Sequence, residues 1–221
     1  MAAKVKTKLN IGERRRKVVA FILLTIISIL CVLPLLWAFG TSFKKNALTD
    51  VMSIIPREFS FHNYIQLFSN EDAPVFRWML NSVVISGVHT LLYIVIAALA
   101  GFAFGVAEWK GRNVVFGLLL ATAMVPNVIN LVPLYKLITS MELNGNPLAL
   151  ILPGLGGVLY MLLIRQYFMS VAKELVEAAQ LEGAGMFRIF LQIEVPLSKP
   201  AFMVAAMMAF LGSWNDYLWP S

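Results

Sequence analysis

Five apolar stretches separated by shorter polar segments dominate the sequence. They run from about 18 to 39, 80 to 107, 114 to 134, 148 to 164 and 201 to 218. A helix needs about 20 mostly apolar residues to cross about 30 Å of hydrocarbon, and each stretch comes close to that length. The pattern therefore predicts an all-α fold, a polytopic transmembrane helical bundle with five spans.

The composition supports a membrane protein. Of the 221 residues, 59% are hydrophobic and only 14% are charged, and the mean hydropathy is +0.77. Soluble domains are less apolar and carry about 25% charged residues. Five buried helices in a chain of this size would leave no polar exterior to surround them, so the bilayer is the expected solvent.

The basic residues predict an orientation rather than a nucleic-acid partner. The formal net charge is +6, and most Lys and Arg residues lie at the N-terminus and in the segments that alternate with it across the membrane. Cytoplasmic segments of membrane proteins carry such an excess. We therefore predict a cytoplasmic N-terminus, a basic tail over residues 1–17 and one transmembrane domain over residues 18–221.

The longest of the cytoplasmic connectors, about 165–199, predicts two helices joined at a break. Apolar residues recur near a 3.6-residue period from Val171 to Leu181. Gly183 and Gly185 then interrupt the pattern, and Pro196 ends a second short apolar stripe. Glycine is typical of the point where a helix gives way to a turn.

This connector carries a spaced motif. Glu177-Ala178-Ala179 is followed after three residues by Gly183, and further on by Ile193 and Val195-Pro196. The spacing resembles the EAA loop of ABC-importer permeases, with valine where that family usually has leucine. The resemblance implies that the loop forms coupling helices that dock on a cytoplasmic ATPase. The residues it assigns to coupling are Glu177, Ala178, Ala179, Glu182, Gly183, Ala184, Ile193 and Pro196.

Further segments are similar to the smaller permease of maltose-type, carbohydrate-importing transporters. They include Met124-Val125-Pro126, Val132-Pro133-Leu134-Tyr135 and the final Trp214-Asn215-Asp216-Tyr217-Leu218-Trp219-Pro220. This resemblance implies a subunit of a sugar importer in a prokaryotic cell membrane. Its implied partners are a dimeric ABC ATPase, a second homologous permease and an extracytoplasmic solute-binding protein, beside the membrane lipid. ATP and Mg²⁺ would be bound by the ATPase, and no cofactor is expected in this chain.

The resemblance also raises two expectations about this chain in particular. The family commonly has six spans, so we expect the chain to be truncated after Ser221. Family members commonly begin the first coupling helix with proline, where this chain has Ala172.

Candidates for contact with a solute are Asn127, Asn130, Asn215 and Asp216. Amide and carboxylate groups within or near a span are costly unless they are buried or face water. They are therefore candidates for lining a pathway. Polar packing between helices is the alternative for the first two, and ordinary solvation at the membrane surface for the last two.

Other classes of function remain open but have little support in the sequence. The alternatives are an ABC permease for a non-sugar solute, an ion-coupled secondary transporter and an intramembrane enzyme. The spans hold almost no ionisable groups beyond His89 for ion coupling, and the sequence shows no catalytic or metal-binding pattern. The alternative to a coupling loop is a pair of amphipathic surface helices whose glutamates are solvated. Charges near helix ends are usually solvated, and we interpret Glu174, Glu182 and Glu194 in this way.

Overall fold

The computed structural model describes residues 11–45, 53 and 55–219, and within them every regular element is a helix. The pairing of extended backbone is limited there to an isolated bridge between Lys44 and Phe59. The helices, in chain order, are α1 (Ile11–Ser42), α2 (His62–Ser69), α3 (Val75–Gly105), α4 (Arg112–Thr122), the 3₁₀ helix η1 (Asn127–Asn130), α5 (Leu131–Ser140), α6 (Leu148–Ile151), α7 (Val158–Ser170), α8 (Lys173–Leu181), α9 (Met186–Ile189), the π-helix η2 (Phe190–Glu194), α10 (Val195–Leu197) and α11 (Lys199–Trp214). The predicted all-α fold is confirmed for these residues. The chain divides into two compact units, residues 1–76 and 77–221, and we describe each by itself.

In the first unit, α1 presents apolar side chains all round. Its residues 12–39 are exposed, and at about 1.5 Å per residue the helix is about 48 Å long. A helix that is hydrophobic on every side and this long fits a lipid environment. The helix begins at Ile11, so the last part of the basic segment before residue 18 is helical.

The end of α1 is tied to the start of α2 by hydrogen bonds. The Asn63 amide donates to the carbonyl oxygens of Ser42 and Lys44 at 3.1 and 2.8 Å, and the Tyr64 hydroxyl donates to Ser42 Oγ at 2.8 Å. The bonds satisfy carbonyl groups that the C-terminus of α1 leaves without intrahelical partners.

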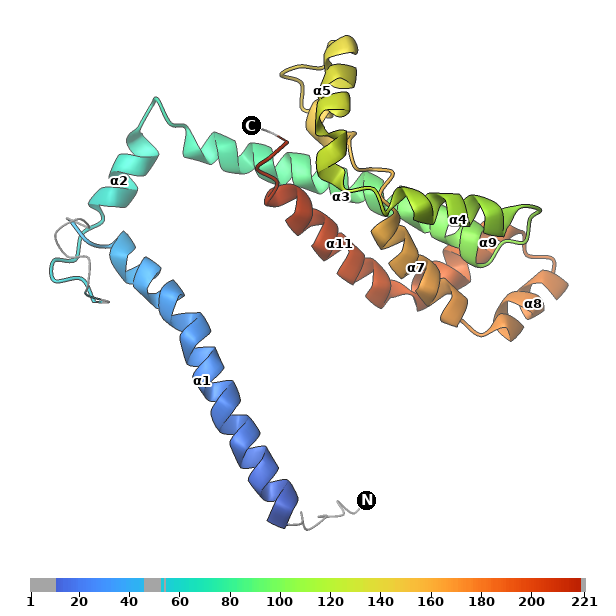
Figure 1. Ribbon diagram of the computed structural model, residues 1–221, viewed down its shortest axis with the longest axis horizontal. Coiled ribbons are helices and arrows are strands. Elements are labelled where there is room, and N and C mark those ends of the chain that lie inside the picture. Colours follow the sequence, from blue (N-terminus) through green and yellow to red (C-terminus); the bar gives the residue numbers. More distant parts are fainter. Residues whose placement is uncertain (1–10, 46–52, 54, 220–221) are drawn as a thin grey trace. The chain divides into compact units, whose positions relative to one another are not determined.

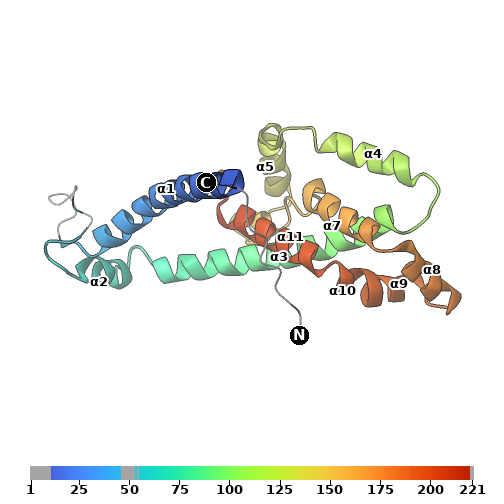
Figure 2. The ribbon, with the colours of Figure 1, turned by 90° about the horizontal axis from the view of Figure 1, so that it is seen from below.

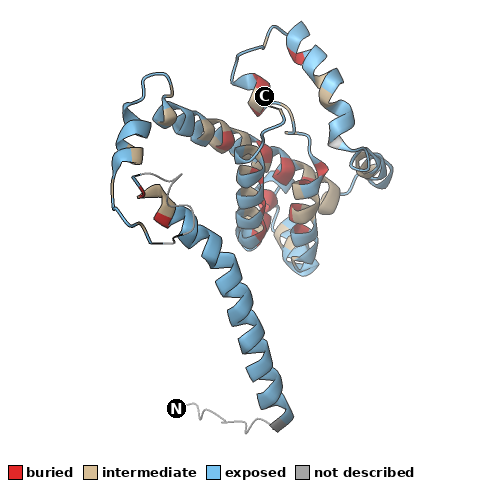
Figure 3. Ribbon diagram, turned by 60° about the vertical axis from the view of Figure 1, so that its left-hand side comes forward, coloured by how far each residue is buried: buried red, intermediate tan, exposed pale blue. Residues whose placement is uncertain are grey.

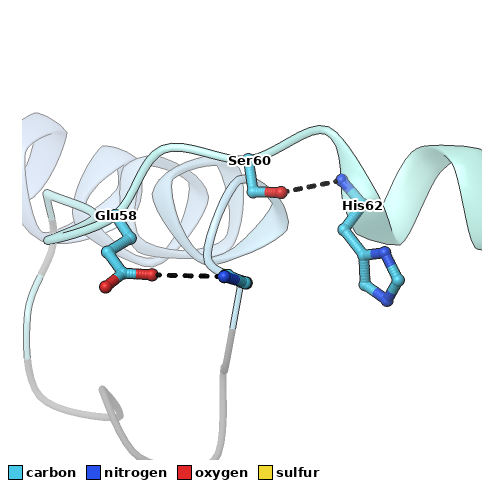
Figure 4. Close-up of polar contacts among 4 residues, drawn as sticks. Glu58, Ser60 and His62 are labelled. Carbon is cyan, nitrogen blue, oxygen red and sulfur yellow. Dashed lines mark hydrogen bonds and ion pairs between the residues drawn. The ribbon is translucent and has the colours of Figure 1, made fainter.

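Surface polar contacts reinforce this connection only weakly. Figure 4 shows Glu58, whose Oε2 atom lies 3.9 Å from Lys45 Nζ, and the backbone N–H of His62, which donates to Ser60 Oγ at 3.1 Å. Both side chains of the ion pair are more than half exposed. Such pairs contribute about 0 to 1 kcal/mol, so the hydrogen bonds of Asn63 matter more.

Helices α3, α7 and α11 form the core of the second unit (Figures 1 and 2). Their buried residues include Tyr93 and Phe102 of α3, Ile164 and Phe168 of α7, and Ala205 of α11. Figure 3 shows the buried positions on the facing sides of these helices, with the outer sides exposed. The unit is thus a small bundle with an apolar core and an apolar exterior.

Small residues bring α3 close to α7. A Cβ atom on Gly101 would lie 3.2 Å from the Arg165 backbone nitrogen, and one on Gly105 would lie 3.2 Å from Arg165 Cγ. Gly101 and Gly105 are one turn apart, and Ala97 lies one turn before them. This small-x-x-x-small pattern lets two helix backbones approach within a membrane.

Within the described part of the chain, two helices, Gly12–Ser42 and Val75–Gly105, are long and apolar enough to cross a bilayer. A third span is possible if Met186–Leu197 and Lys199–Trp214 are taken together, but these segments are bent by 79° relative to one another. They therefore cannot both follow the membrane normal. The sequence predicts a span at 201–218, and of the two segments only α11 overlaps it.

The third and fourth predicted spans are each interrupted. Helix α4 ends at Thr122, and Pro126 adopts an extended conformation before η1 begins. Between α6 and α7, Gly154 has a φ of +84° and the Tyr93 hydroxyl donates a hydrogen bond to the Gly157 carbonyl. Broken helices are tolerated at membrane depth where protein groups satisfy the freed backbone. The five-span arrangement stays a prediction.

Candidate functional site

Helices α8 and α9 and the segments η2 and α10 make up most of the connector at 165–199 (Figure 1). The predicted pair of helices with a break at Gly183 is present: α8 ends at Leu181 and α9 begins at Met186. The predicted coupling residues therefore lie on α8, on the turn between α8 and α9 that holds Glu182, Gly183 and Ala184, and on the short helices that follow.

The end of α8 explains the spacing between the alanines and the glycine. Gly183 has a φ of +83°, its N–H donates to the Gln180 carbonyl at 2.9 Å, and the Ala184 N–H donates to the Ala179 carbonyl at 2.9 Å. These are the two bonds of a Schellman motif, which ends a helix with a left-handed residue, usually glycine. Ala179 and Ala184 are both partly buried against the core, as the hydrophobic contact of this motif requires.

The start of α8 accounts for Ala172 in place of proline. Ala172 precedes the helix with φ −60° and ψ 123°. Proline locks φ near −65°, so alanine adopts here the conformation that proline would impose. The direction of entry into α8 is therefore kept without the proline ring.

A wide helical turn precedes Pro196. The Val195 N–H donates to the Phe190 carbonyl, five residues earlier, which makes Phe190–Glu194 a π-helix. Proline has no N–H and its ring collides with the carbonyl four residues before it in an α-helix. The π-turn accommodates this defect, and such turns are frequent at functional sites.

The connector is anchored to the core at η2. Ile189 is fully buried, and the Phe190 ring packs against Phe102 of α3 and Phe168 of α7, with centroid distances of 5.2 and 6.2 Å. Ile193 is partly buried against the same cluster. The connector is thus in direct contact with two helices of the bundle.

The outer part of the connector has no such cover. Leu181 is 90% exposed and Phe187 is 67% exposed, and Glu177, Ala178, Glu182 and Pro196 are also exposed. Large apolar side chains gathered at a surface mark an interaction site with protein or membrane. We call the exposed surface formed by Leu181, Glu182, Gly183 and Phe187 the connector tip.

A cavity of about 580 Å³ lies beside the connector. Its wall joins the end of α3, the start of α4 and the end of α7 to α8 and η2, through residues that include Glu108, Arg112, Lys173, Glu177 and Glu194. The interpretation of Glu194 as a solvated charge is wrong, because its exposure is 1%. Burial raises the pKa of Glu194 to about 7.

Sequence reasoning missed Glu194 because its place at a helix end is the usual signal of a solvated charge. Burial here depends on α3 and α7, which are distant in sequence. The glycine pair at 101 and 105 was missed as well, although its four-residue spacing was available as a signal.

The candidates for solute contact are not brought together. Asn130 is exposed in η1, and the side chain of Asn127 lies outside the described part of the chain. The Asn215 amide donates to the Leu211 carbonyl at 2.9 Å, and Asp216 Oδ1 accepts the Trp219 N–H at 3.3 Å. The last two residues thus make local contacts after α11.

A second cavity, of about 860 Å³, lies at the opposite end of α3. Its wall includes Asn81, Tyr135, Asn146 and Trp219 but none of Asn130, Asn215 and Asp216. Asn81 here and Gly105 in the other cavity are separated by about 36 Å along α3, at 1.5 Å per residue. The two cavities therefore lie about a membrane thickness apart.

The described residues contain no group of three or more His, Cys, Asp or Glu side chains that could hold a metal ion. The arrangement consists of an apolar bundle, a surface connector anchored to it and two cavities at its ends.

Comparison with known proteins agrees with this architecture. Residues 94–221 match the family described as "Binding-protein-dependent transport system inner membrane component". The chain is 35% identical over 169 residues to the arabinooligosaccharides transport system permease protein AraQ of Bacillus subtilis, covering 76% of this chain and 60% of AraQ.

The chain covers a larger share of two further relatives. The galactooligosaccharides transport system permease protein GanQ of Bacillus subtilis is 32% identical over 206 residues, 92% of this chain and 73% of GanQ. The sn-glycerol-3-phosphate transport system permease protein UgpE of Shigella flexneri is 32% identical over 193 residues, 85% of this chain and 69% of UgpE. The chain thus spans between 60 and 73% of the length of these three relatives. The resemblance to sugar-transporting ABC permeases is confirmed, and the chain belongs to the family of binding-protein-dependent transport system inner membrane components.

Proposed function

We propose that the chain is a membrane-spanning permease subunit of a binding-protein-dependent ABC importer, and that its solute is a sugar or a related polar molecule. The names of the relatives support this class: arabinooligosaccharides, galactooligosaccharides and sn-glycerol-3-phosphate are all polar and rich in hydroxyl groups. Since the relatives differ in solute, the proposal stops at the class.

The proposed transmembrane arrangement has five spans in this chain and a cytoplasmic N-terminus. In it, α4 with η1 and α5 forms the third span, and α6 with α7 forms the fourth. Interrupted helices of this kind are typical of transporters, where they lie at the pathway. The distribution of Lys and Arg supports the orientation.

The proposed coupling site is the connector from α8 to α10, with Glu177, Ala178, Ala179, Glu182, Gly183, Ala184, Ile193 and Pro196. The observation that carries it is an uncovered apolar tip on an anchored base: Leu181 is 90% exposed, whereas Ile189 is fully buried. A separate ATPase would cover the tip. Closure of its two subunits around ATP would then move the connector and the bundle helices attached to it.

The proposed partners are this ATPase dimer, a second homologous permease and an extracytoplasmic solute-binding protein. ATP and Mg²⁺ belong to the ATPase, since the sequence of this chain contains no G-x-x-x-x-G-K-[ST] phosphate loop. We place solute passage among Asn127, Asn130, Asn215 and Asp216. The cavity that includes Asn81, Tyr135 and Trp219 supplies further amide and aromatic groups.

The test is a matched pair of substitutions at Gly183. Nothing lies within 4 Å of a Cβ atom at this position, so the added Cβ atom does not collide, and the positive φ strains both variants alike. Both residue types tolerate the left-handed conformation better than most, and they have nearly the same shape. Gly183→Asp adds a charge to the connector tip, and Gly183→Asn does not.

The measurement is solute-stimulated ATP hydrolysis by the assembled transporter in proteoliposomes. Gly183→Asp should insert normally and lose most of the stimulation, because a charge in a desolvated interface is costly. Gly183→Asn should keep a larger share of it. Full stimulation in the Asp variant would refute coupling at this surface.

A further inference from the structure

The cavity beside the connector is built around a carboxylate that has no partner. Glu194 lines its wall and is 1% exposed. Neither carboxylate oxygen has a hydrogen-bond partner in the described residues, and the hydroxyl of Ser198, one helical turn later, is also buried without one. Buried polar groups without partners are rare, and a buried charge without one is strongly unfavourable.

The chain does not supply a counter-charge in this arrangement. Arg112 and Lys173 line the same cavity, yet no ion pair joins either of them to Glu194 among the described residues. The Arg112 guanidinium instead donates to the Ala107 carbonyl at 2.9 Å. Glu194 therefore remains available to a group from outside the chain.

The balance of charge in the cavity indicates the sign of that group. Glu108, Glu177 and Glu194 contribute three carboxylates to the wall, and Arg112 and Lys173 contribute two cations. With every group ionised, the formal net charge of the wall is −1. One monovalent cation would neutralise it, and an anion would add to the excess.

The size of the cavity and its apolar lining indicate an organic cation. About 580 Å³ lies within the range of small-molecule sites and exceeds what a bare ion requires. Phe168, Met169, Val171 and Val176 also line the wall, so an alkyl chain has apolar surface to contact. Burial favours the neutral form of Glu194 when the cavity holds no cation.

We propose that this cavity binds one organic cation, an ammonium or guanidinium group, with Glu194 as its charged partner. The cation has two possible sources: a free alkylamine from solution, or a Lys or Arg side chain of the docked ATPase. The site itself stands on the geometry of this chain. Only the second source rests on the proposed function.

The test measures binding of n-butylammonium chloride to the assembled, detergent-purified transporter by saturation-transfer NMR. We expect saturable binding to the wild type, at least about tenfold weaker binding to Glu194→Gln, and unchanged binding to Glu174→Gln. Glu174 is exposed on the same connector and does not line the cavity, so its substitution is a matched loss of charge. Uncharged n-butanol is tested on the wild type as a second control. It shows whether binding requires the positive charge of the probe, and it does so even if Glu194→Gln folds poorly.

Cryo-EM of the same preparation, without the probe, distinguishes the sources. Saturable binding that depends on Glu194 assigns the site to a free cation. A lack of probe binding, together with an ATPase Lys or Arg side chain within ion-pair distance of Glu194, assigns it to the partner.

Other outcomes overturn the inference. These are binding that is equal in wild type and Glu194→Gln, equal binding of butanol, or a cavity that neither binds the probe nor holds a partner's cation. Lys173 folded onto Glu194 in the assembled protein would also overturn it. If the transporter couples ATP hydrolysis to transport normally and still gives one of these results, the cation site is refuted and the proposed function is not.

Discussion

The Schellman motif at the end of α8 predicts a difference between two neighbouring glycines. Gly183 and Gly185 are both exposed, and a Cβ atom at either would meet nothing within 4 Å. Their backbones differ, with φ +83° at Gly183 and φ −71° at Gly185. We therefore expect Gly183→Ser to destabilise the turn and Gly185→Ser to leave it intact.

The magnitude follows from the backbone alone. A residue with a Cβ atom costs about 1 to 2 kcal/mol in the left-handed conformation relative to glycine. This corresponds to about a 5- to 30-fold change in the equilibrium between closed and open turns. Gly185 precedes the first residue of α9, a position where serine is favoured, so the second substitution should be neutral or slightly stabilising.

Hydrogen–deuterium exchange with mass spectrometry measures this local opening directly. The amides to follow are those of Gly183 and Ala184 or their substituted equivalents, which donate to the Gln180 and Ala179 carbonyls. Their exchange should be about 5 to 30 times faster in Gly183→Ser than in the wild type, and little changed in Gly185→Ser. Equal effects of the two substitutions, or no effect of Gly183→Ser, would refute the assignment of the motif.

Two further predictions concern the bundle and the buried carboxylate. Gly157→Ala should lower the free energy of unfolding by about 1 to 3 kcal/mol, because its Cβ atom would lie 2.5 Å from the Tyr93 hydroxyl. The control is Gly156→Ala, whose Cβ atom would meet nothing within 4 Å. Similar melting temperatures for the two variants would contradict the close packing at Gly157. The raised pKa of Glu194, about 7, means that the folded state keeps a proton which the unfolded state releases near the usual value of about 4.3. Stability should therefore fall as the pH rises from about 4.5 and level off above 7, by at most about 4 kcal/mol. Glu194→Gln should remove this slope from the melting temperatures. A wild-type slope that persists in Glu194→Gln would show that another group titrates.

The pattern of the sequence and the structure agree best where neighbouring residues determine the outcome. The two long helices, α1 and α3, follow from uninterrupted apolar runs, and the break after α8 follows from Gly183. These features depend on backbone propensity and on hydrogen bonds between residues a few positions apart.

Agreement is poorer where a continuous apolar run hides a break. The stretches 114–134 and 148–164 have the hydropathy of spans, but Pro126 and Gly154 interrupt them. Hydropathy sums the transfer of side chains into lipid and contains no term for the geometry of the backbone. The structure therefore has shorter helices than the apolar pattern predicted.

By itself, the sequence determined the helical content and the apolar character of the surface, and it predicted the family that the comparisons show. Tertiary structure alone decided that Glu194 is buried and that α3 meets α7 at Gly101. The physical reason is that propensity and hydropathy act through neighbours along the chain. Burial depends instead on which distant helices pack together, and Glu194 lost its water only when α3, α7 and the connector met around it.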